Sequence, residues 1–138
     1  MKNIKIDFEL KQPVQNPLLI VISGPSGIGK DTIVEGLKDR GLPFHFVITA
    51  TSRPPRDYEV DGEDYFFYNQ CTFEKMIEEG EFLEYAWVYS AYKGVPKCQV
   101  REALESGEDV VMRLDVQGAR TVHDLCPDAV LIFLTATS

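Results

Sequence analysis

Short apolar runs alternate with amphipathic stretches at both ends of the chain. Residues 18–22 (LLIVI) form a continuous, β-branched run, typical of a parallel strand buried on both faces. A glycine-rich turn follows, and then a helix-like stretch at residues 32–40 that Gly41 and Pro43 should end. The other outer elements that the pattern predicts are strands at 46–49, 110–116 and 129–134 and helices at 96–106 and 118–125. This alternation predicts a parallel sheet with helices on both faces.

The middle of the chain has a different pattern. Residues 52–64 are polar and turn-rich, and their two prolines exclude regular structure. Residues 65–68 (YFFY) and 82–89 (FLEYAWVY) are aromatic and predict strands. Between them we expect a short helix at residues 73–79, with Thr72 as its N-cap and Gly80 as its end.

We therefore predict an α/β fold in which a second lobe is inserted into a core. The core comprises residues 17–51 and 96–138. The inserted lobe, residues 52–95, is partly antiparallel, and residues 1–16 form an N-terminal extension.

Composition limits the possible functions. The chain has 138 residues, 44% of them hydrophobic, which is enough for the core of one ordinary domain. A net charge of −8 argues against nucleic acid or an anionic membrane as a partner. The longest apolar run is too short to span a bilayer, and residues 1–16 have no signal-peptide pattern. Three widely spaced cysteines indicate reduced thiols, so we expect a soluble intracellular protein. The sequence leaves its oligomeric state open between a monomer and a homodimer.

Residues 24–31 (GPSGIGKD) match the phosphate-binding loop G-x-x-x-x-G-K-[ST] except at the last position. The match lies between a buried-strand pattern and a helix pattern, where loop N–H groups would point at phosphates and Lys30 would add a mobile charge. An ordinary glycine-rich turn with a solvated lysine is the alternative. The predicted ATP ligands are Gly24, Pro25, Ser26, Gly27, Ile28, Gly29, Lys30, Asp31 and Thr32.

Asp31 stands where the motif requires a hydroxyl. Against triphosphate oxygens at ~4 Å, a carboxylate costs about 1–4 kcal/mol per charge pair. The helix dipole stabilises a carboxylate in the first turn by only about 0.3–1 kcal/mol. Mg²⁺ reverses the sign, because a hard cation accepts carboxylate oxygen as a ligand. We therefore predict Asp31 as a metal ligand and expect nucleotide binding to depend on Mg²⁺.

The loop and four further motifs resemble, in order and spacing, those of the guanylate kinase family. The further motifs are TATSRPPRDYEVDGEDYFF (49–67), GEFLEYAWVYSAYKG (80–94), LDVQGA (114–119) and FLTATS (133–138), so the resemblance runs from about Pro17 to the end. The GKD ending is similar to that of plant organelle-type members. The resemblance implies a three-layer P-loop NTPase core and transfer of the γ-phosphate of Mg²⁺-bound ATP to GMP, giving GDP and ADP. It also implies a location in the cytoplasm, a plastid or a mitochondrion.

Arg53 and Arg56 flank a stiff diproline. Planar guanidinium groups grip phosphate bidentately, although two solvated surface arginines are the alternative. The resemblance implies that this pair holds the GMP phosphate together with Tyr65, and we count Lys30, Arg53 and Arg56 as the catalytic residues.

Glu84 lies in an aromatic, strand-like stretch, where a half-buried carboxylate is costly unless paired. An outward-facing strand residue is the alternative. The resemblance implies that Glu84 accepts the guanine N1–H and 2-amino group, and that Thr49 meets the base O6. Asp115 ends an apolar strand, where α/β sheets place ligand groups, although a simple helix cap is the alternative. The resemblance places Asp115 near the GMP base and the metal.

Three features depart from the family pattern. Lys93 stands where many members have a tyrosine that grips the GMP phosphate, so we expect either that it acts there as a cation or that this contact is lost. Val95 replaces a small hydroxyl residue, and Arg113 replaces an aspartate. The family also continues with an arginine-bearing lid, a strand and a helix, so we expect this chain to be an N-terminal portion truncated at the C-terminus. A catalytically inactive binding module of the same superfamily and another P-loop kinase of a small metabolite are the alternative functions.

Overall fold

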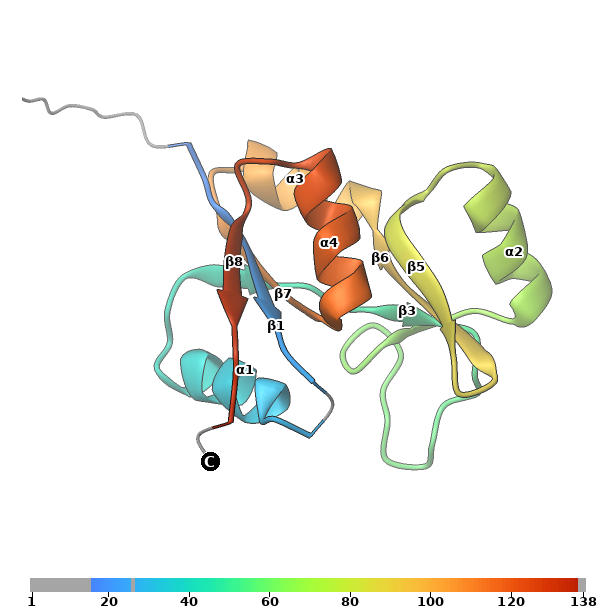
Figure 1. The fold of residues 1–138 in the computed structure, drawn as a ribbon. Helices are drawn as coiled ribbons and strands as arrows, with labels where there is room; N and C mark the ends of the chain where they lie inside the picture. Colours follow the sequence, from blue (N-terminus) through green and yellow to red (C-terminus); the bar gives the residue numbers. More distant parts are fainter. Residues whose placement is uncertain (1–15, 26, 137–138) are drawn as a thin grey trace, which may run out of the picture.

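The computed structural model describes residues 16–25 and 27–136. The elements in chain order are β1 (Leu19–Ser23), α1 (Lys30–Asp39), β2 (Phe44–Phe46), β3 (Ala50–Thr51), β4 (Phe66–Phe67), α2 (Gln70–Glu78), β5 (Phe82–Val88), β6 (Ala91–Pro96), α3 (Lys97–Glu105), β7 (Asp109–Leu114), α4 (Val116–Leu125) and β8 (Val130–Phe133) (Figure 1). They form two four-stranded sheets, which lie side by side in Figure 1.

The first sheet is the predicted core. Its strand order is β2-β7-β1-β8, and every neighbouring pair is parallel. On one face, Val34 of α1 packs against Ile22 and Val111. On the other face, α3 and α4 pack against the alternate residues of β1 and β7, which include Val21 and Val110. The prediction of a three-layer parallel core is confirmed, because continuous apolar strands need cover on both faces.

The second sheet has the order β4-β3-β6-β5. Its β3–β4 pair is parallel, whereas β3–β6 and β5–β6 are antiparallel. Helix α2 covers one face, where the fully buried Phe73 stacks on Phe82 and Tyr92 at ring-centroid distances of 4.4 and 5.1 Å. This aromatic core explains the unusual composition of the middle of the chain, and the partly antiparallel lobe is confirmed.

The strand predicted at residues 46–49 is wrong. Strand β2 ends at Phe46 and β3 begins at Ala50, so the predicted segment spans the passage from one sheet to the other. The side chain of Gln99 takes the place of a strand there: its Oε1 accepts the Ile48 N–H at 2.7 Å, and its Nε2 donates to the Ile48 carbonyl at 2.9 Å. A long-range side-chain contact thus satisfies a backbone that the local pattern assigned to a ladder.

Two local features of the second sheet also differ from prediction. Helix α2 begins at Gln70, because Asn69 and not Thr72 is its N-cap: Asn69 Oδ1 accepts the Thr72 N–H at 2.8 Å. Strand β6 was not predicted. It joins β5 through Tyr89 and Ser90, whose φ values of 51° and 65° lie in the left-handed region that asparagine and glycine usually occupy in such turns.

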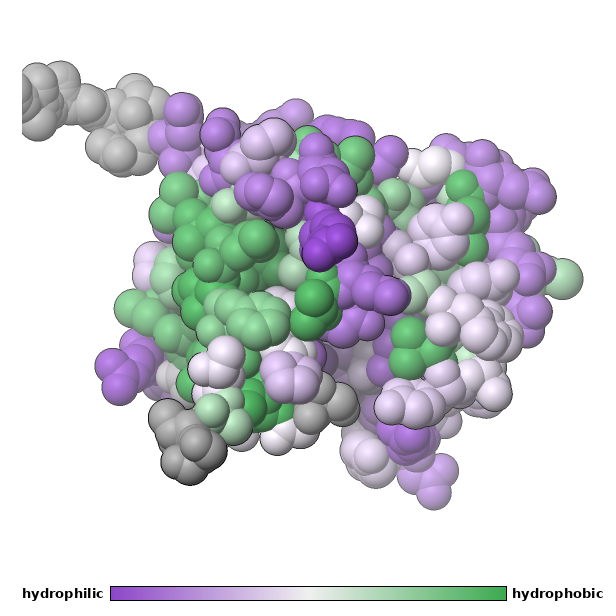
Figure 2. Space-filling model, viewed as in Figure 1, coloured by the Kyte–Doolittle hydropathy of each residue, from purple (hydrophilic) through white to green (hydrophobic). Residues whose placement is uncertain are grey.

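Strand β8 is an edge of the core sheet, and its four residues are 38–55% exposed. Figure 2 shows hydrophobic surface gathered over this side of the core. The three cysteines are free. In the part of the chain that the structure describes, no helix is long and apolar enough to cross a membrane.

Candidate nucleotide-binding site

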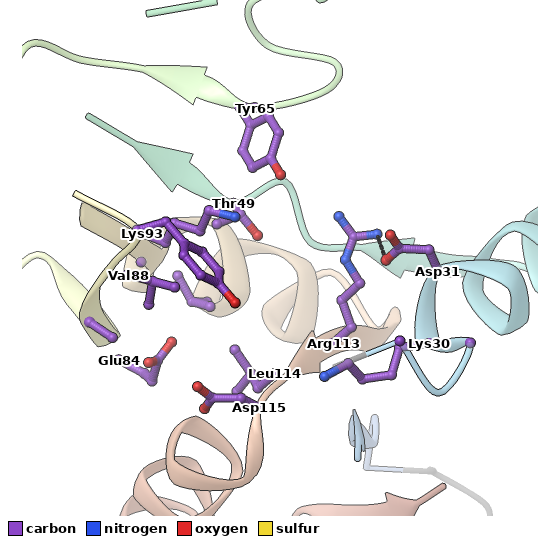
Figure 3. A pocket seen from close by; sticks show the side chains of 16 residues that line it. Lys30, Asp31, Thr49, Tyr65, Glu84, Val88, Lys93, Arg113, Leu114 and Asp115 are labelled. Carbon is purple, nitrogen blue, oxygen red and sulfur yellow. Dashed lines mark ion pairs between the residues drawn. The ribbon is translucent and has the colours of Figure 1, made fainter. Parts of the chain in front are cut away.

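A pocket of about 530 Å³ lies between the two sheets. The loop, α1, the second sheet and the end of β7 all contribute residues to it (Figure 3). Its lining residues are Gly27, Gly29, Lys30, Asp31, Thr49, Tyr65, Glu84, Ala86, Val88, Tyr89, Lys93, Gly94, Val95, Arg113, Leu114 and Asp115. The carboxyl ends of parallel strands are the usual ligand side of an α/β sheet, and the pocket lies there.

The glycine-rich loop connects β1 to α1 and depends on its glycines. Gly24 has φ 150°, and a Cβ there would lie 2.7 Å from the Leu134 carbonyl oxygen. Gly29, the residue before α1, has φ 107°, which L side chains rarely adopt. Helix α1 begins at Lys30, two residues earlier than predicted, and the Lys30 Nζ donates to the Gly24 carbonyl at 2.8 Å. The amine therefore folds back over the loop, beside the helix N-terminus.

Asp31 forms an ion pair with Arg113: its Oδ1 lies 2.7 Å from the Arg113 Nη1. The aspartate is in the first turn of α1, and the arginine is near the end of β7. Nothing local in the sequence links these two residues, so the repulsion expected for Asp31 was uncompensated. The pair supplies that compensation, because an adjacent cation offsets the repulsion between a carboxylate and phosphate oxygens.

A β-bulge aims Glu84 into the pocket. Phe82 pairs with Pro96 and Glu84 with Val95, so the register of β5 shifts between Phe82 and Glu84. In a regular strand, residues two apart share a face, so the bulge lets Phe82 face the α2 core while Glu84 faces the pocket.

The environment of Glu84 disfavours its charge. Burial, and secondarily the nearby carboxylate of Asp115, raise the pKa of Glu84 to about 7. Its Oε2 lies over α4, where a Cβ added at Gly118 would be 3.1 Å away. Within the described part of the chain, no hydrogen bond or ion pair satisfies this carboxylate. A desolvated carboxylate in this state is stabilised by any ligand that brings N–H donors.

Asp115 both lines the pocket and caps a helix. Strand β7 ends at Leu114, two residues earlier than predicted, and Asp115 is the N-cap of α4, with its Oδ1 accepting the Gly118 N–H at 2.7 Å. Helix capping was the alternative interpretation of this residue, and it is compatible with a position in the pocket wall.

Arg53 and Arg56 do not line the pocket. Glu59 holds both: its two carboxylate oxygens accept from Arg53 Nη1 and Nη2 at 2.7 and 2.8 Å, and its Oε1 accepts the Arg56 N–H at 2.9 Å. The hydrogen bond from Arg53, reinforced by the Arg56 N–H, lowers the pKa of Glu59 to about 2. The pKa of Arg53 is raised, chiefly by the same hydrogen bond. Glu59 thus occupies the bidentate fork expected to grip a phosphate.

Tyr65 joins this arginine to the pocket. The Arg53 Cζ lies 4.9 Å from the Tyr65 ring centroid, and the Lys93 Nζ lies 5.6 Å from it. Tyr65 and Lys93 line the pocket, and the Tyr65 hydroxyl points into it (Figure 3). Arg53 therefore lies immediately behind the pocket wall.

Seven side chains predicted to bind nucleotide or metal meet around the pocket: Lys30, Asp31, Thr49, Tyr65, Glu84, Lys93 and Asp115. Gly27 and Gly29 of the loop also line it. The predicted residues outside its lining are Gly24, Pro25, Ile28, Thr32, Arg53 and Arg56, and Ser26 lies outside the described residues. Glu59 and Tyr89 were not predicted from the sequence, and neither was the contact between Arg113 and Asp31. The acidic position three residues after Arg56 was the only local sign of Glu59.

The oxygen donors fit a magnesium ion only in part. Asp31 and Asp115 are hard ligands that Mg²⁺ accepts, but each has one oxygen engaged, by Arg113 and by the Gly118 N–H. Among the described residues, no group of three or more histidine, cysteine, aspartate or glutamate side chains could hold a metal ion. Such a donor set suits a cation that arrives with nucleotide phosphates and takes one or two protein carboxylates.

The parallel core, the glycine-rich loop before α1 and the pocket at the strand ends define a P-loop protein with an inserted second lobe. A family model described as guanylate kinase matches residues 16–138, so this chain belongs to the guanylate kinase family.

Curated relatives and a solved structure with the same fold are also guanylate kinases. The chain is 49% identical over 127 residues to guanylate kinase 2, chloroplastic/mitochondrial, of Oryza sativa subsp. japonica, covering 91% of this chain and 45% of the relative. It is 46% identical over 125 residues to the guanylate kinase of Clostridioides difficile, covering 91% and 61%. The crystal structure of guanylate kinase from Anaplasma phagocytophilum shares the fold, with a TM-score of 0.69 at 24% identity over 87% of this chain and 61% of that chain. The chain thus spans 45% and 61% of the two curated relatives.

Proposed function

We propose that the protein to which this chain belongs is a guanylate kinase, which transfers the γ-phosphate of ATP to GMP and yields ADP and GDP. The observation that carries this proposal is the desolvated, unsatisfied carboxylate of Glu84 on one wall of a pocket whose other wall is the phosphate-binding loop with Lys30. One wall can recognise a base, and the other can hold phosphates.

Glu84 is the guanine ligand in this proposal. The guanine edge offers two adjacent donors, N1–H and the 2-amino group, to one carboxylate, whereas adenine offers neither at these positions. Thr49 lines the same pocket, where its hydroxyl can donate to the base O6. Because an unpaired, half-buried carboxylate is penalised, the site should discriminate against bases without these donors.

The GMP phosphate is held by four side chains: Tyr65, Lys93, Arg53 and Arg56. Tyr65 and Lys93 already line the pocket, and Arg53 packs against the Tyr65 ring. Glu59 now fills the fork of Arg53, so we infer that the incoming phosphate replaces this carboxylate. A phosphate carries more charge than a carboxylate and accepts the same bidentate donors, which favours the exchange.

The loop and Lys30 hold the ATP phosphates, and the γ-phosphoryl group passes directly and in line to the GMP phosphate. Lys30 releases the Gly24 carbonyl and follows the negative charge of the transferred group. Mg²⁺ bound to ATP would neutralise phosphate charge, with Asp31 and Asp115 as the protein carboxylates within reach. The protein residues otherwise align the substrates and exclude water.

Phosphotransfer to a panel of nucleotides tests the proposal. The full-length protein is incubated with ATP, Mg²⁺ and one of GMP, IMP, AMP or CMP, and the diphosphates are quantified by chromatography. We expect GDP to form fastest by a wide margin, because only GMP presents both donors to Glu84. Binding of nucleotides without any diphosphate product would instead support the catalytically inactive binding module. AMP as the preferred acceptor would contradict the proposal.

The location named for the rice relative and the GKD ending of the loop support a plastid or mitochondrion as the compartment. Microscopy of the full-length protein fused to a fluorescent protein would test this, and an even cytoplasmic signal would contradict it.

A further inference from the structure

We propose that Arg113 is a phosphate-binding residue of the transfer site and that Asp31 is the positioning residue that orients it. This inference rests on the proposed kinase function. It concerns two charged side chains that the loop motif does not explain: a carboxylate where the motif has a hydroxyl, and an arginine at the end of β7.

The strand geometry brings Arg113 to the pocket. Side chains alternate along β7, and Val111 faces the α1 side of the sheet, where it packs with Val34. Arg113, two residues later, shares that face and pairs in register with Ile22 of β1. Strand β1 ends one residue after Ile22, at Ser23, and the loop follows. The Arg113 side chain therefore lies beside the first turn of α1, where it contacts Asp31.

Stability alone does not account for the pair. Its side chains are 36% exposed for Arg113 and 79% exposed for Asp31, and exposed ion pairs contribute little to folding. The ion pair joins one guanidinium nitrogen, Nη1, to Asp31. A guanidinium carries five N–H donors, and beyond this ion pair no hydrogen bond from the Arg113 side chain occurs among the described residues. The remaining donors are available to an anion.

The position of Arg113 fits the junction between the two phosphates. In Figure 3 its guanidinium lies between Lys30 and the Tyr65 hydroxyl, on the side opposite Glu84 and Asp115. Lys30 belongs to the ATP loop and Tyr65 to the proposed GMP phosphate site. A phosphoryl group passing from one to the other would come within reach of Arg113. Positive charge at this point stabilises the group in transfer, and one arginine there can be worth about 10³–10⁵ in rate.

Asp31 gains a role that does not require direct contact with substrate. A long, flexible arginine loses less conformational entropy on binding the phosphoryl group when it is already held in the reacting orientation. The carboxylate fixes Nη1 and leaves the rest of the fork directed elsewhere. The same contact neutralises Asp31, so that the loop does not present a bare negative charge to ATP.

The test uses steady-state kinetics of GMP phosphorylation on the full-length protein, with thermal unfolding measured for every variant. Arg113→Gln removes the donors, Arg113→Lys keeps the charge without the fork, and Asp31→Asn removes the anchor. The double exchange Asp31→Arg with Arg113→Asp keeps an ion pair but reverses it. Arg101→Gln, an exposed arginine on α3, is the matched control.

We expect Arg113→Gln to lower kcat on the order of 10³-fold while KM for GMP changes less than about 3-fold. Arg113→Lys should fall between that variant and the wild type. Asp31→Asn should lower kcat about 10-fold, and should have no further effect once Arg113 is glutamine, because positioning acts only through the arginine. The reversed pair should unfold near the wild-type temperature, because exposed ion pairs contribute little to folding, and it should not restore kcat.

Three outcomes would overturn the inference. They are a kcat within about 3-fold of the wild type for Arg113→Gln, recovery of kcat in the reversed pair, or independent effects of the two single variants. Recovery of kcat in the reversed pair would identify a structural ion pair, and independent effects would show that Asp31 does not act through Arg113. A wild-type protein that forms no GDP would overturn the proposed function itself, and it is distinguished by the unmutated control in the same assay.

Discussion

The two walls of the pocket hold their carboxylates in opposite ways. On the wall formed by the core sheet, Asp31 is paired with Arg113 and Asp115 accepts the Gly118 N–H, each at 2.7 Å. On the wall formed by the second sheet, Glu84 has no such donor among the described residues, and burial raises its pKa to about 7. The difference lies in the hydrogen-bond donors and cations that the fold places beside each carboxylate: Arg113 beside Asp31, the Gly118 N–H beside Asp115, and neither kind beside Glu84.

A carboxylate with donors is stable as an anion before any ligand arrives, whereas a desolvated one without donors becomes stable only when a ligand supplies them. The contrast separates two tasks. The core wall suits charged groups, the phosphates and a metal ion, because its carboxylates are already stabilised as anions. The second wall suits a neutral base edge, which binds only if it presents N–H donors to Glu84.

The largest effect should come from the core wall. Lys30→Met should lower kcat by about 10²–10³-fold, because it removes a cation from the transferred phosphate, and it should leave GMP affinity unchanged. Steady-state kinetics and calorimetry with GMP alone measure the two quantities. Lys75→Met, at an exposed position on α2, is the control. A comparable loss of GMP affinity in Lys30→Met would show that the two walls are not separate.

The second effect separates the base from the phosphate. Glu84→Gln should weaken both guanosine and GMP by roughly 10- to 100-fold, since hydrogen bonds to a charged group are worth about 1.5–3 kcal/mol. Arg53→Met should weaken GMP similarly but leave guanosine unaffected, because guanosine has no phosphate. Calorimetry with each ligand measures both. Glu81→Gln, an exposed neighbour, is the control, and an Arg53→Met effect on guanosine would refute the assignment.

The third effect is the pH dependence of base binding. The pKa of Glu84 is raised to about 7, and only the carboxylate form can accept both guanine donors. Guanosine affinity should therefore rise about 10-fold between pH 6 and 8, as the ionised fraction grows. Guanosine avoids the titration of the GMP phosphate. The Glu84→Gln variant should show a flat profile, and a flat profile in the wild type would contradict the raised pKa.

The same shift has the opposite sign for the stability of the ligand-free protein. Because the folded-state pKa lies above the ordinary 4.5, Glu84 contributes most to the free energy of unfolding below pH 4.5, and this contribution is lost as pH rises through about 7. Denaturant unfolding of wild type and Glu84→Gln at pH 5 and 8 measures it. The variant should gain relative to wild type at pH 8, and an equal difference at both pH values would exclude the effect.

The smallest effect concerns a cap on the second lobe. Asn69→Ala should lower the free energy of unfolding by about 1 kcal/mol, because Asn69 satisfies the first turn of α2. Thr72→Ala, at the cap position that the sequence suggested, should cost far less. Denaturant melts compare the two, and the reverse ranking would show that α2 begins three residues later.

The core sheet could be predicted from the sequence because its signals are local. Apolar runs, glycine stops and the loop motif determine β1, α1, β7, α4 and β8 to within about two residues. Strand β6 could not be predicted, because its turn places Tyr89 and Ser90 in a left-handed conformation that neither residue signals. The β2–β3 boundary depends on Gln99, which is about 50 residues distant in sequence.

The site was partly predictable for the same reason. Lys30 was proposed from the loop motif between a strand and a helix, and Asp115 from its place at the end of an apolar strand and from the family resemblance. The ion pair of Asp31 with Arg113 instead joins residues that are distant in the sequence. The direction of Glu84 depends on a bulge whose extra residue leaves no local mark. The hydrogen bond from Arg53 to Glu59 likewise could not be predicted, because it forms only when the loop between the two residues is folded.

A crystal structure of the full-length protein with GMP tests the central claim most directly. We expect the guanine N1–H and 2-amino group within hydrogen-bond distance of the Glu84 carboxylate. We also expect the GMP phosphate to contact Tyr65, with Arg53 released from Glu59. A guanine base bound away from Glu84, or a phosphate bound with the Arg53–Glu59 fork still closed, would contradict it.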